Sequence, residues 1–524
     1  MAIMKRSIGP ISLMFTAVSG ILGSAWLFGP YYAAQMAGPA ALISWFVGAI
    51  AMMIIAMTFA ELTSMFPIAG AQARFMLFSH GSMTSFLFGW IMWLAYAAVA
   101  PAETMAILQY MGSSFPVLLA SKNGTTILST LGYIVAGIVL FAMCVINLIS
   151  IKWLARYNAM VVWVKVFVPL IVAVVILSLA FNTSNFTSAG FMPSGWEGTL
   201  SALSLGGIVF ALTGYAPAIV LAGEAKNPQK TIPIVLGGSL LICFFVYFIL
   251  QVALIGAVPA GSLANGWSHL QFAGSQSPFV GIAENSLHQH WLHYLILVTA
   301  VITPLGTAII FIASSARVAY AMSENGFFPK SMETLSKRGV PFWAVLLNFI
   351  VGMILFFPVP GWQGMMGFLV AAFVLGYAIG PLALLSLRKQ VPHFPRRFNL
   401  PVFKTWCFMA FFFTNLILYW VGWDIYSKML IGIILGLAVM IISRWRHHRD
   451  NNLDARTSIW AFIYIFGEGI ISYLGNFGNG IGLLPKDWDM LIVAIFSALI
   501  LYLSQRQALP AERTQAYIDS IKDW

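Results

Sequence analysis

Two stretches of small and helix-breaking residues interrupt apolar segments of this 524-residue chain. The first reads SGILGSAW at residues 19–26 and is followed by Gly29-Pro30, and the second reads GGIVFALTGYAP at residues 206–217. An interrupted helix frees N–H groups at the start of one half and carbonyl groups at the end of the other. Free N–H groups favour a carboxylate and free carbonyls favour a cation such as an ammonium. This chemistry suits a zwitterion such as an α-amino acid.

Two ionisable residues lie in apolar surroundings: Lys165 within VVWVKVF at 161–167, and Glu103 within APAET at 100–104. A charge inside a membrane is costly unless it is paired or neutralised, so such residues are candidates for function. We expect Lys165 and Glu103 to take part in proton coupling. Two alternatives stay open: Lys165 as a structural cation held by carbonyls of the first broken segment, and Glu103 as its counter-ion.

Other charged residues mark the ends of apolar segments. Glu61 and Glu224 are expected to pair with basic residues on the inner side, where they would help to close an inner gate, and Arg317 is interpreted in the same way. Glu468 lies inside a late apolar segment, and we expect it to form a structural hydrogen bond between helices.

The composition indicates the elements that position these residues. Hydrophobic residues make up 60% of the chain and charged residues 8%, whereas a soluble protein carries roughly a quarter of its residues as charged ones. Lipid must therefore cover the surface, and stretches of about 20 apolar residues are expected to cross the membrane. Fourteen such spans are predicted, near 11–34, 39–63, 85–111, 125–147, 158–181, 198–222, 232–258, 291–320, 340–358, 362–386, 404–423, 428–445, 458–476 and 487–505.

The basic residues predict the orientation. Three of the 27 lysines and arginines fall in predicted outer segments (Lys122, Lys428 and Lys486), Lys165 falls in a span, and the other 23 fall on the inner side. This asymmetry predicts a bacterial inner-membrane protein with both termini in the cytoplasm. It also explains the net charge of +11 without nucleic-acid binding. The three cysteines show no spacing suited to a metal or disulfide, and no cofactor is expected.

The two interrupted spans occupy matching positions in the chain. Each opens a block of five spans, about 11–181 and 198–386, and an odd number inverts the second block relative to the first. Paired broken helices in inverted blocks indicate a binding site in mid-membrane, although small residues in one segment alone would equally suit helix packing. The predicted units are a transporter core at 1–390, spans eleven and twelve at 391–450, and spans thirteen and fourteen with a cytoplasmic tail at 451–524.

These segments resemble the amino acid–polyamine–organocation superfamily. ILGSA at 21–25 resembles its G-S-G break, AGEAKNPQKTIP at 222–233 resembles its K-N-P-x-R-x-I-P signature, and FPIAGA at 66–71 resembles its P-x-x-G-G turn. Lys165 matches a fifth-span lysine of proton-coupled members. The resemblance covers spans one to twelve. GSAWLF at 23–28 and the fourteen-span layout extend it to the bacterial aspartate–proton symporters.

The resemblance implies an all-α, leucine-transporter-type fold with two inverted five-helix repeats and additional helices. It implies that the N–H groups of Ser24 and Ala25 take the substrate carboxylate, and that the carbonyls of Ile21, Phe210 and Thr213 take its ammonium. The expected substrate-binding residues are Ile21, Gly23, Ser24, Ala25, Phe210, Ala211, Thr213 and Gly214.

The same resemblance gives further residues a role. Phe210 would cover the pocket, Gly214 would permit the second break, and Lys165 would bridge spans one and five and exchange the coupled proton. Two departures weaken the match: Ala25 replaces the second glycine of G-S-G, and Lys230 replaces an arginine and loses its planar fork. No arginine lies at mid-membrane to bind a side-chain carboxylate, so aspartate as the substrate depends on the subgroup resemblance alone.

We therefore expect a proton-coupled amino acid symporter that works by alternating access, with an amino acid, protons and the lipid bilayer as its partners. An obligate amino acid exchanger on the same fold is the first alternative. An intramembrane enzyme would need a catalytic constellation at membrane depth, and a channel would need a ring of charge or a filter motif; neither pattern is evident. The sequence gives no indication of the oligomeric state.

Overall fold

The computed structural model describes residues 8–68, 70–122, 125–149, 151–336, 339–357, 361–447, 453–485 and 488–520. These residues are predominantly helical, and strands β1 (Leu119–Lys122) and β2 (Thr125–Leu128) pair as a short antiparallel hairpin. Predicted positions outside these ranges are Lys5, Arg6, Ala69, Lys337, Arg338, Arg449, Lys486 and Lys522.

The helices follow the predicted order of spans. The first part of the chain forms α1 (Pro10–Ile21), α2 (Ala25–Ala37), η1 (Gly38–Ala40), α3 (Ala41–Met65), α4 (Ala71–His80), α5 (Ser82–Met111), η2 (Pro116–Leu118), α6 (Thr130–Ile149), α7 (Ile151–Ala180) and η3 (Thr183–Phe186). The second part forms α8 (Gly195–Ser204), α9 (Ile208–Thr213), α10 (Ala216–Val220), η4 (Ala222–Glu224), α11 (Pro228–Ala257), η5 (Ala260–Leu263), η6 (Trp267–His269), α12 (Pro278–Gly281), η7 (Ile282–Ser286), α13 (His290–Glu324), η8 (Lys330–Glu333), α14 (Phe342–Leu355), α15 (Gly361–Tyr377) and α16 (Ile379–Gln390). The last part forms α17 (Phe403–Val421), α18 (Trp423–His447), η9 (Ala455–Ser458), α19 (Ile459–Leu474), α20 (Asp489–Arg506) and α21 (Ala511–Asp519).

Judged by the length and composition of the described helices, the structure has fewer membrane spans than the sequence predicts. Among the described residues, 11 helical stretches are long and apolar enough to cross a membrane, or 12 when the bent pair Gly195–Ser204 and Ile208–Val220 forms one span. The difference has a physical cause: α1 and α14 are apolar but shorter than a span, and the helical stretch Ala25–Met65 joins the second half of the first predicted span to the second. Every predicted span contains helix, but the count of fourteen stays a prediction.

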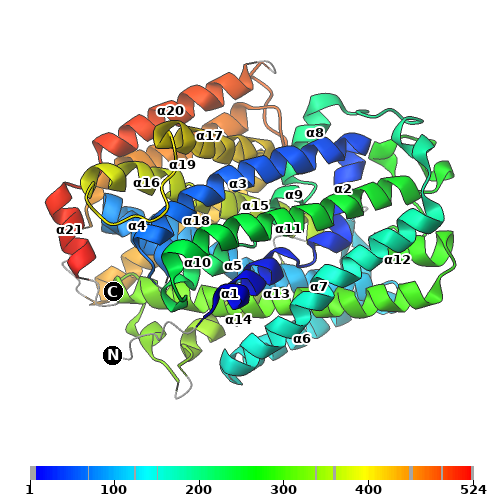
Figure 1. Cartoon of the computed structure of the whole chain (residues 1–524), viewed down its shortest axis with the longest axis horizontal. Helices are drawn as coiled ribbons and strands as arrows, with labels where there is room; N and C mark the ends of the chain where they lie inside the picture. Colours follow the sequence, from blue (N-terminus) through cyan, green and yellow to red (C-terminus); the bar gives the residue numbers. More distant parts are fainter. Residues whose placement is uncertain are drawn as a thin grey trace.

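The long helices lie side by side, roughly along the long axis of the molecule (Figure 1). The apolar windows of Gly361–Gln390 and Ser82–Met111 are 100% and 94% buried, so α15, α16 and α5 form the centre. The windows in α18, α20 and α6 are 28%, 33% and 33% buried. Their exposed leucines, isoleucines and phenylalanines provide the surface that lipid is expected to cover.

Helices α4, α10 and α21 lie toward one end of the bundle, at the left in Figure 1, and α12 lies toward the other end. We call the first of these the α4 end. It carries Arg74, Arg317 and Arg388, which the sequence assigns to the cytoplasmic side.

Candidate functional site

The first predicted break is present between α1 and α2. Helix α1 ends at Ile21, Leu22 has φ −83° and ψ 75°, and α2 begins at Ala25. The N–H of Gly23 donates to the carbonyl of Ile21 over 3.0 Å, a local turn that replaces the helical pattern. Carbonyl groups at the end of α1 and N–H groups at the start of α2 are therefore released from helical bonding.

The second predicted break is present as well. Helix α8 ends at Ser204, and Gly207 adopts φ +82°, a left-handed conformation that favours glycine. Helix α9 ends at Thr213, and α10 begins at Ala216. The chain bends by 42° between α8 and the following helices.

The two breaks touch each other through glycine. A Cβ on Gly20 would lie 2.3 Å from the carbonyl oxygen of Gly214, and a Cβ on Gly214 would lie 2.2 Å from the carbonyl oxygen of Gly20. Both distances are shorter than any real contact, so only glycine fits at these two positions. Gly214 therefore serves the close packing of the two broken helices.

The N–H of Ser24, which the sequence assigned to the substrate carboxylate, already has an acceptor. It donates to Oε2 of Glu103 over 2.9 Å. Glu103 lies on α5 and is fully buried, and its Oε1 has no hydrogen-bond partner among the described residues. A Cβ on Gly23 would lie 2.4 Å from this Oε1, so glycine is what allows the carboxylate to reach the break. A protein carboxylate thus lies where a substrate carboxylate was expected.

Side-chain hydroxyls occupy the carbonyls that were assigned to the substrate ammonium. The hydroxyl of Tyr247 donates to the carbonyl of Ile21 over 2.8 Å, and that of Tyr377 donates to the carbonyl of Thr213. The hydroxyl of Thr213 in turn donates to the carbonyl of Phe210 over 2.8 Å. Because a carbonyl oxygen has two lone pairs, each could also accept a bond from an ammonium group.

Aromatic side chains cover the break from α15. Nε1 of Trp362 donates to Oγ of Ser24 over 2.8 Å. Its ring stacks on Phe28 at 4.7 Å between centroids and meets Phe210 edge-on at 6.4 Å. Phe210 was expected to cover the site, whereas Trp362 carried no signal in the sequence, because tryptophan is common in membrane proteins and its neighbours come from distant segments.

Lys165 links α7 to the end of α1, as the resemblance implied. Its fully buried Nζ donates to the carbonyl of Ser19 and to Oγ1 of Thr307, each over 2.7 Å. Thr307 on α13 also donates to Ser19 over 2.9 Å. Among the described residues Lys165 and Glu103 do not come within ion-pair distance, but their charges still interact across the break, so the counter-ion alternative stays open. Thr307 reaches toward both groups, because it too lies beside Gly23.

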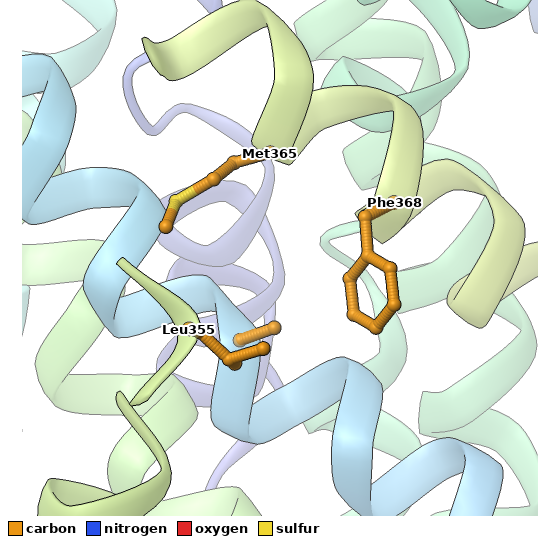
Figure 2. A pocket seen from close by; sticks show the side chains of 4 residues that line it. Leu355, Met365 and Phe368 are labelled. Carbon is orange, nitrogen blue, oxygen red and sulfur yellow. The ribbon is translucent and has the colours of Figure 1, made fainter. Parts of the chain in front are cut away.

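The predicted site residues are brought together and closed off from solvent. Ser24, Ala25, Ala211 and Thr213 have no exposed surface, and Phe210 has 7%. Figure 2 shows a nearby void lined by Ala98, Leu355, Met365 and Phe368. Its volume is about 10 Å³, room for about one water and not for an amino acid. This conformation must open before a substrate enters.

Ion pairs cross the α4 end of the bundle. Arg388 on α16 holds Glu61 of α3 with two bonds of 2.7 and 2.6 Å. Arg317 on α13 lies 3.2 Å from Glu224, which follows the second broken span. The predicted pairing of these charges is confirmed. Both pairs join segments of different helices, as an inner gate requires.

Glu468 on α19 lies outside this constellation and does not make the hydrogen bond that we expected. It is fully buried, and neither carboxyl oxygen has a partner among the described residues.

Comparison with known proteins identifies the family to which this chain belongs. The profile of the amino acid permease family matches residues 8–439, most of the chain. The chain belongs to this family. It is 35% identical over 513 residues to the glutamate/serine transporter AimA of Bacillus subtilis, covering 95% of this chain and 93% of that protein. It is 30% identical over 510 residues to the aspartate-proton symporter of Bacillus subtilis, covering 97% of both. The branched-chain amino acid permease BcaP of the same organism is 26% identical over 457 residues, 86% of this chain and 95% of that protein.

Family membership confirms the amino acid–polyamine–organocation resemblance, including the likeness to aspartate–proton symporters. It also confirms an all-α, multi-pass membrane protein of the leucine-transporter type, and its general activity is amino acid transport. The unit boundaries at 390 and 450 and the roles of single residues stay predictions.

Proposed function

We propose that this amino acid permease is a proton symporter for a small amino acid, and that Glu103 couples the proton to the substrate. The observation that carries the proposal is the 2.9 Å hydrogen bond from Ser24 N–H to Glu103. One N–H group cannot serve two carboxylates equally, so the substrate carboxylate and Glu103 compete for it.

The competition makes proton and substrate bind together. Two carboxylates at one buried site repel each other strongly, unless one of them takes up a proton. Protonated Glu103 carries no charge and is a weaker acceptor, so it yields the Ser24 N–H to the substrate. Substrate arrival therefore favours protonation of Glu103, and proton loss on the other side of the membrane favours release of the substrate.

Lys165 supports this exchange from the other side of the break. One of its hydrogen bonds goes to the carbonyl of Ser19 near the end of α1, and the other goes to Thr307 on α13. We propose that Lys165 responds to the conformation of the break through its bond to Ser19, and that it contributes to proton coupling together with Glu103. Thr307, which contacts both Lys165 and the surroundings of Glu103, is the connecting group.

The proposed substrate is a small zwitterion, with its carboxylate at Ser24 and Ala25 and its ammonium at the carbonyls of Ile21, Phe210 and Thr213. Serine, glutamate and aspartate are the first candidates, because two relatives of this chain are a glutamate/serine transporter and an aspartate-proton symporter. The proposed location is the bacterial inner membrane, with both termini in the cytoplasm.

Uptake into substrate-free proteoliposomes tests the proposal. An imposed gradient, acidic outside, should drive accumulation of one of these amino acids, and collapse of the gradient by a protonophore should abolish it. An obligate exchanger would show no uptake without internal substrate. Accumulation that ignores the pH gradient would refute proton symport.

A further inference from the structure

A shallow groove of about 430 Å³ opens at the α4 end, away from the breaks. It lies between α3, the start of α11 and the segment that follows α16. Met57, Ile234 and Phe398 form much of its apolar lining, and Lys230 and Arg397 line it as well.

The two cations of the groove have no acidic partner in the part of the chain that the structure describes. Lys230 and Arg397 are exposed, and among the described residues neither side chain makes a hydrogen bond or an ion pair. Arg74, Arg317 and Arg388 at the same end each hold a carboxylate. The groove therefore offers two free positive charges on a mostly apolar surface, a combination that suits an anion with an apolar body.

The apolar surface continues from the groove along α11. Ile234, Leu241 and Phe245 are 68%, 52% and 59% exposed. They lie seven and four residues apart, which places them on one face of the helix.

Helix α3 runs beside α11 (Figure 1) and continues the same surface. Its Phe46 and Ile50 are 51% and 55% exposed, and the ring of Phe46 packs on Phe244 of α11 at 5.2 Å. An apolar strip thus extends from the groove toward the middle of the molecule.

We propose that this groove binds an anionic phospholipid, independently of the proton-coupling proposal. The phosphate lies between Lys230 and Arg397, beside Gln229, which also lines the groove, and the acyl chains follow the strip on α3 and α11. The Lys and Arg distribution assigns this end to the cytoplasm, where basic pockets between spans bind anionic headgroups. The apolar lining and its continuation favour a lipid over free phosphate.

A lipid bound in this groove should affect transport because of where the groove lies. Lys230 lies in the first turn of α11, the helix that follows the second broken span, and Arg397 lies in the segment whose Leu400 N–H donates to Glu61 over 2.8 Å. A phosphate between these cations ties both segments together, so anionic lipid should alter the transport rate.

Titration of the delipidated full-length protein, followed by native mass spectrometry, tests the site. Phosphatidylglycerol should bind more tightly than phosphatidylcholine. The double variant Lys230→Gln and Arg397→Gln should weaken phosphatidylglycerol binding by about thirtyfold. The matched control Lys330→Gln and Arg506→Gln removes one exposed lysine and one exposed arginine outside the groove, and should leave this binding unchanged.

A second variant separates a lipid from a soluble anion. Ile234→Asn keeps both cations and should weaken phosphatidylglycerol binding, whereas inorganic phosphate should compete poorly with the lipid. Equal loss of binding in the groove and control double variants would overturn the proposal. Effective competition by inorganic phosphate together with unchanged lipid binding in Ile234→Asn would overturn it in favour of a soluble-anion site.

Discussion

Replacing Glu103 by glutamine tests the proposed coupling directly. Glutamine has nearly the same shape and keeps an oxygen acceptor for the Ser24 N–H, which Glu103 accepts over 2.9 Å. It cannot take up or release a proton, and it carries no charge. The variant should therefore behave like the protonated wild-type protein at every pH.

Two contributions set the expected size of the effect. A hydrogen bond to a charged group contributes about 1 kcal/mol more than a neutral one, and this difference opposes substrate binding while Glu103 is ionised. Two carboxylates about 4 Å apart repel by about 4 kcal/mol at an effective dielectric constant of about 20. The wild-type protein avoids this repulsion by taking up one proton, so its substrate Kd should rise with pH, by at most about tenfold per pH unit. The Kd of Glu103→Gln should stay low and independent of pH.

Equilibrium binding of radiolabelled substrate to purified protein across a pH series measures the slope of Kd against pH for the wild-type protein and for Glu103→Gln. The matched control is Glu468→Gln, the same substitution at another fully buried carboxyl, which lies on α19 outside the site. It should keep the wild-type slope. In proteoliposomes, Glu103→Gln should retain exchange of internal for external substrate but lose accumulation driven by a pH gradient.

Proton coupling through Glu103 is refuted if Glu103→Gln keeps the pH dependence of the wild-type Kd, because the proton would then be bound elsewhere. A Kd that becomes independent of pH only in Glu468→Gln would refute it equally. A wild-type Kd that does not change with pH would refute the competition for the Ser24 N–H, whatever the variants do.

Three further predictions follow from the described contacts. Lys165→Ala should abolish pH-driven uptake in proteoliposomes, because it removes the hydrogen bonds that link α7 to Ser19 of α1 and to Thr307 of α13; retained proton-coupled accumulation would contradict the role. Gly20→Ala and Gly214→Ala should each destabilise the protein by about 1–3 kcal/mol in thermal unfolding, because each new Cβ would clash with backbone atoms. Gly29→Ala is the control: its Cβ would lie 3.9 Å from the nearest atom, so it should destabilise the protein less. Burial lowers the pKa of His80 to about 3, so between pH 6.5 and 3 the folded protein binds fewer protons at His80 than the unfolded chain does. About 2 kcal/mol of stability should therefore be lost between pH 7 and pH 5. The variant His80→Gln should lose less stability over this range, and an equal loss in thermal unfolding would contradict the assignment.

The positions of the breaks could be predicted from the sequence because their cause is local. Glycine pairs and proline weaken a helix wherever it packs, and the chain does leave the helix after Ile21 and after Thr213. The ion pairs of Glu61 and Glu224 were predictable for a similar reason, because unpaired charges at the ends of spans find partners among nearby cations. The number of spans stays a prediction, because helices α1 and α14 are apolar but shorter than a membrane span.

The partners of the exposed backbone groups could not be predicted, because they come from helices distant in sequence. Tyr247, Trp362 and Tyr377 reach the breaks from α11 and α15, and no spacing in the chain links them to residues 21–24. The role of Gly214 also needed the structure. The sequence suggested that it permits the break, but a side chain at this position would also push α1 away from α9.

These contacts also bear on how the protein satisfies the backbone groups that its broken helices expose. Unpaired backbone groups in the membrane interior cost several kcal/mol each, so a break needs hydrogen-bond partners from other helices. Here the Ser24 N–H donates to Glu103, and the hydroxyls of Tyr247 and Tyr377 satisfy the carbonyls of Ile21 and Thr213. In the proposed mechanism these side chains are substitutes for the substrate, so its binding is an exchange of partners, which keeps the net free energy of binding small enough for release. Among these substitutes only Glu103 loses its charge when it takes up a proton, so it is the one that can link the exchange to a proton gradient.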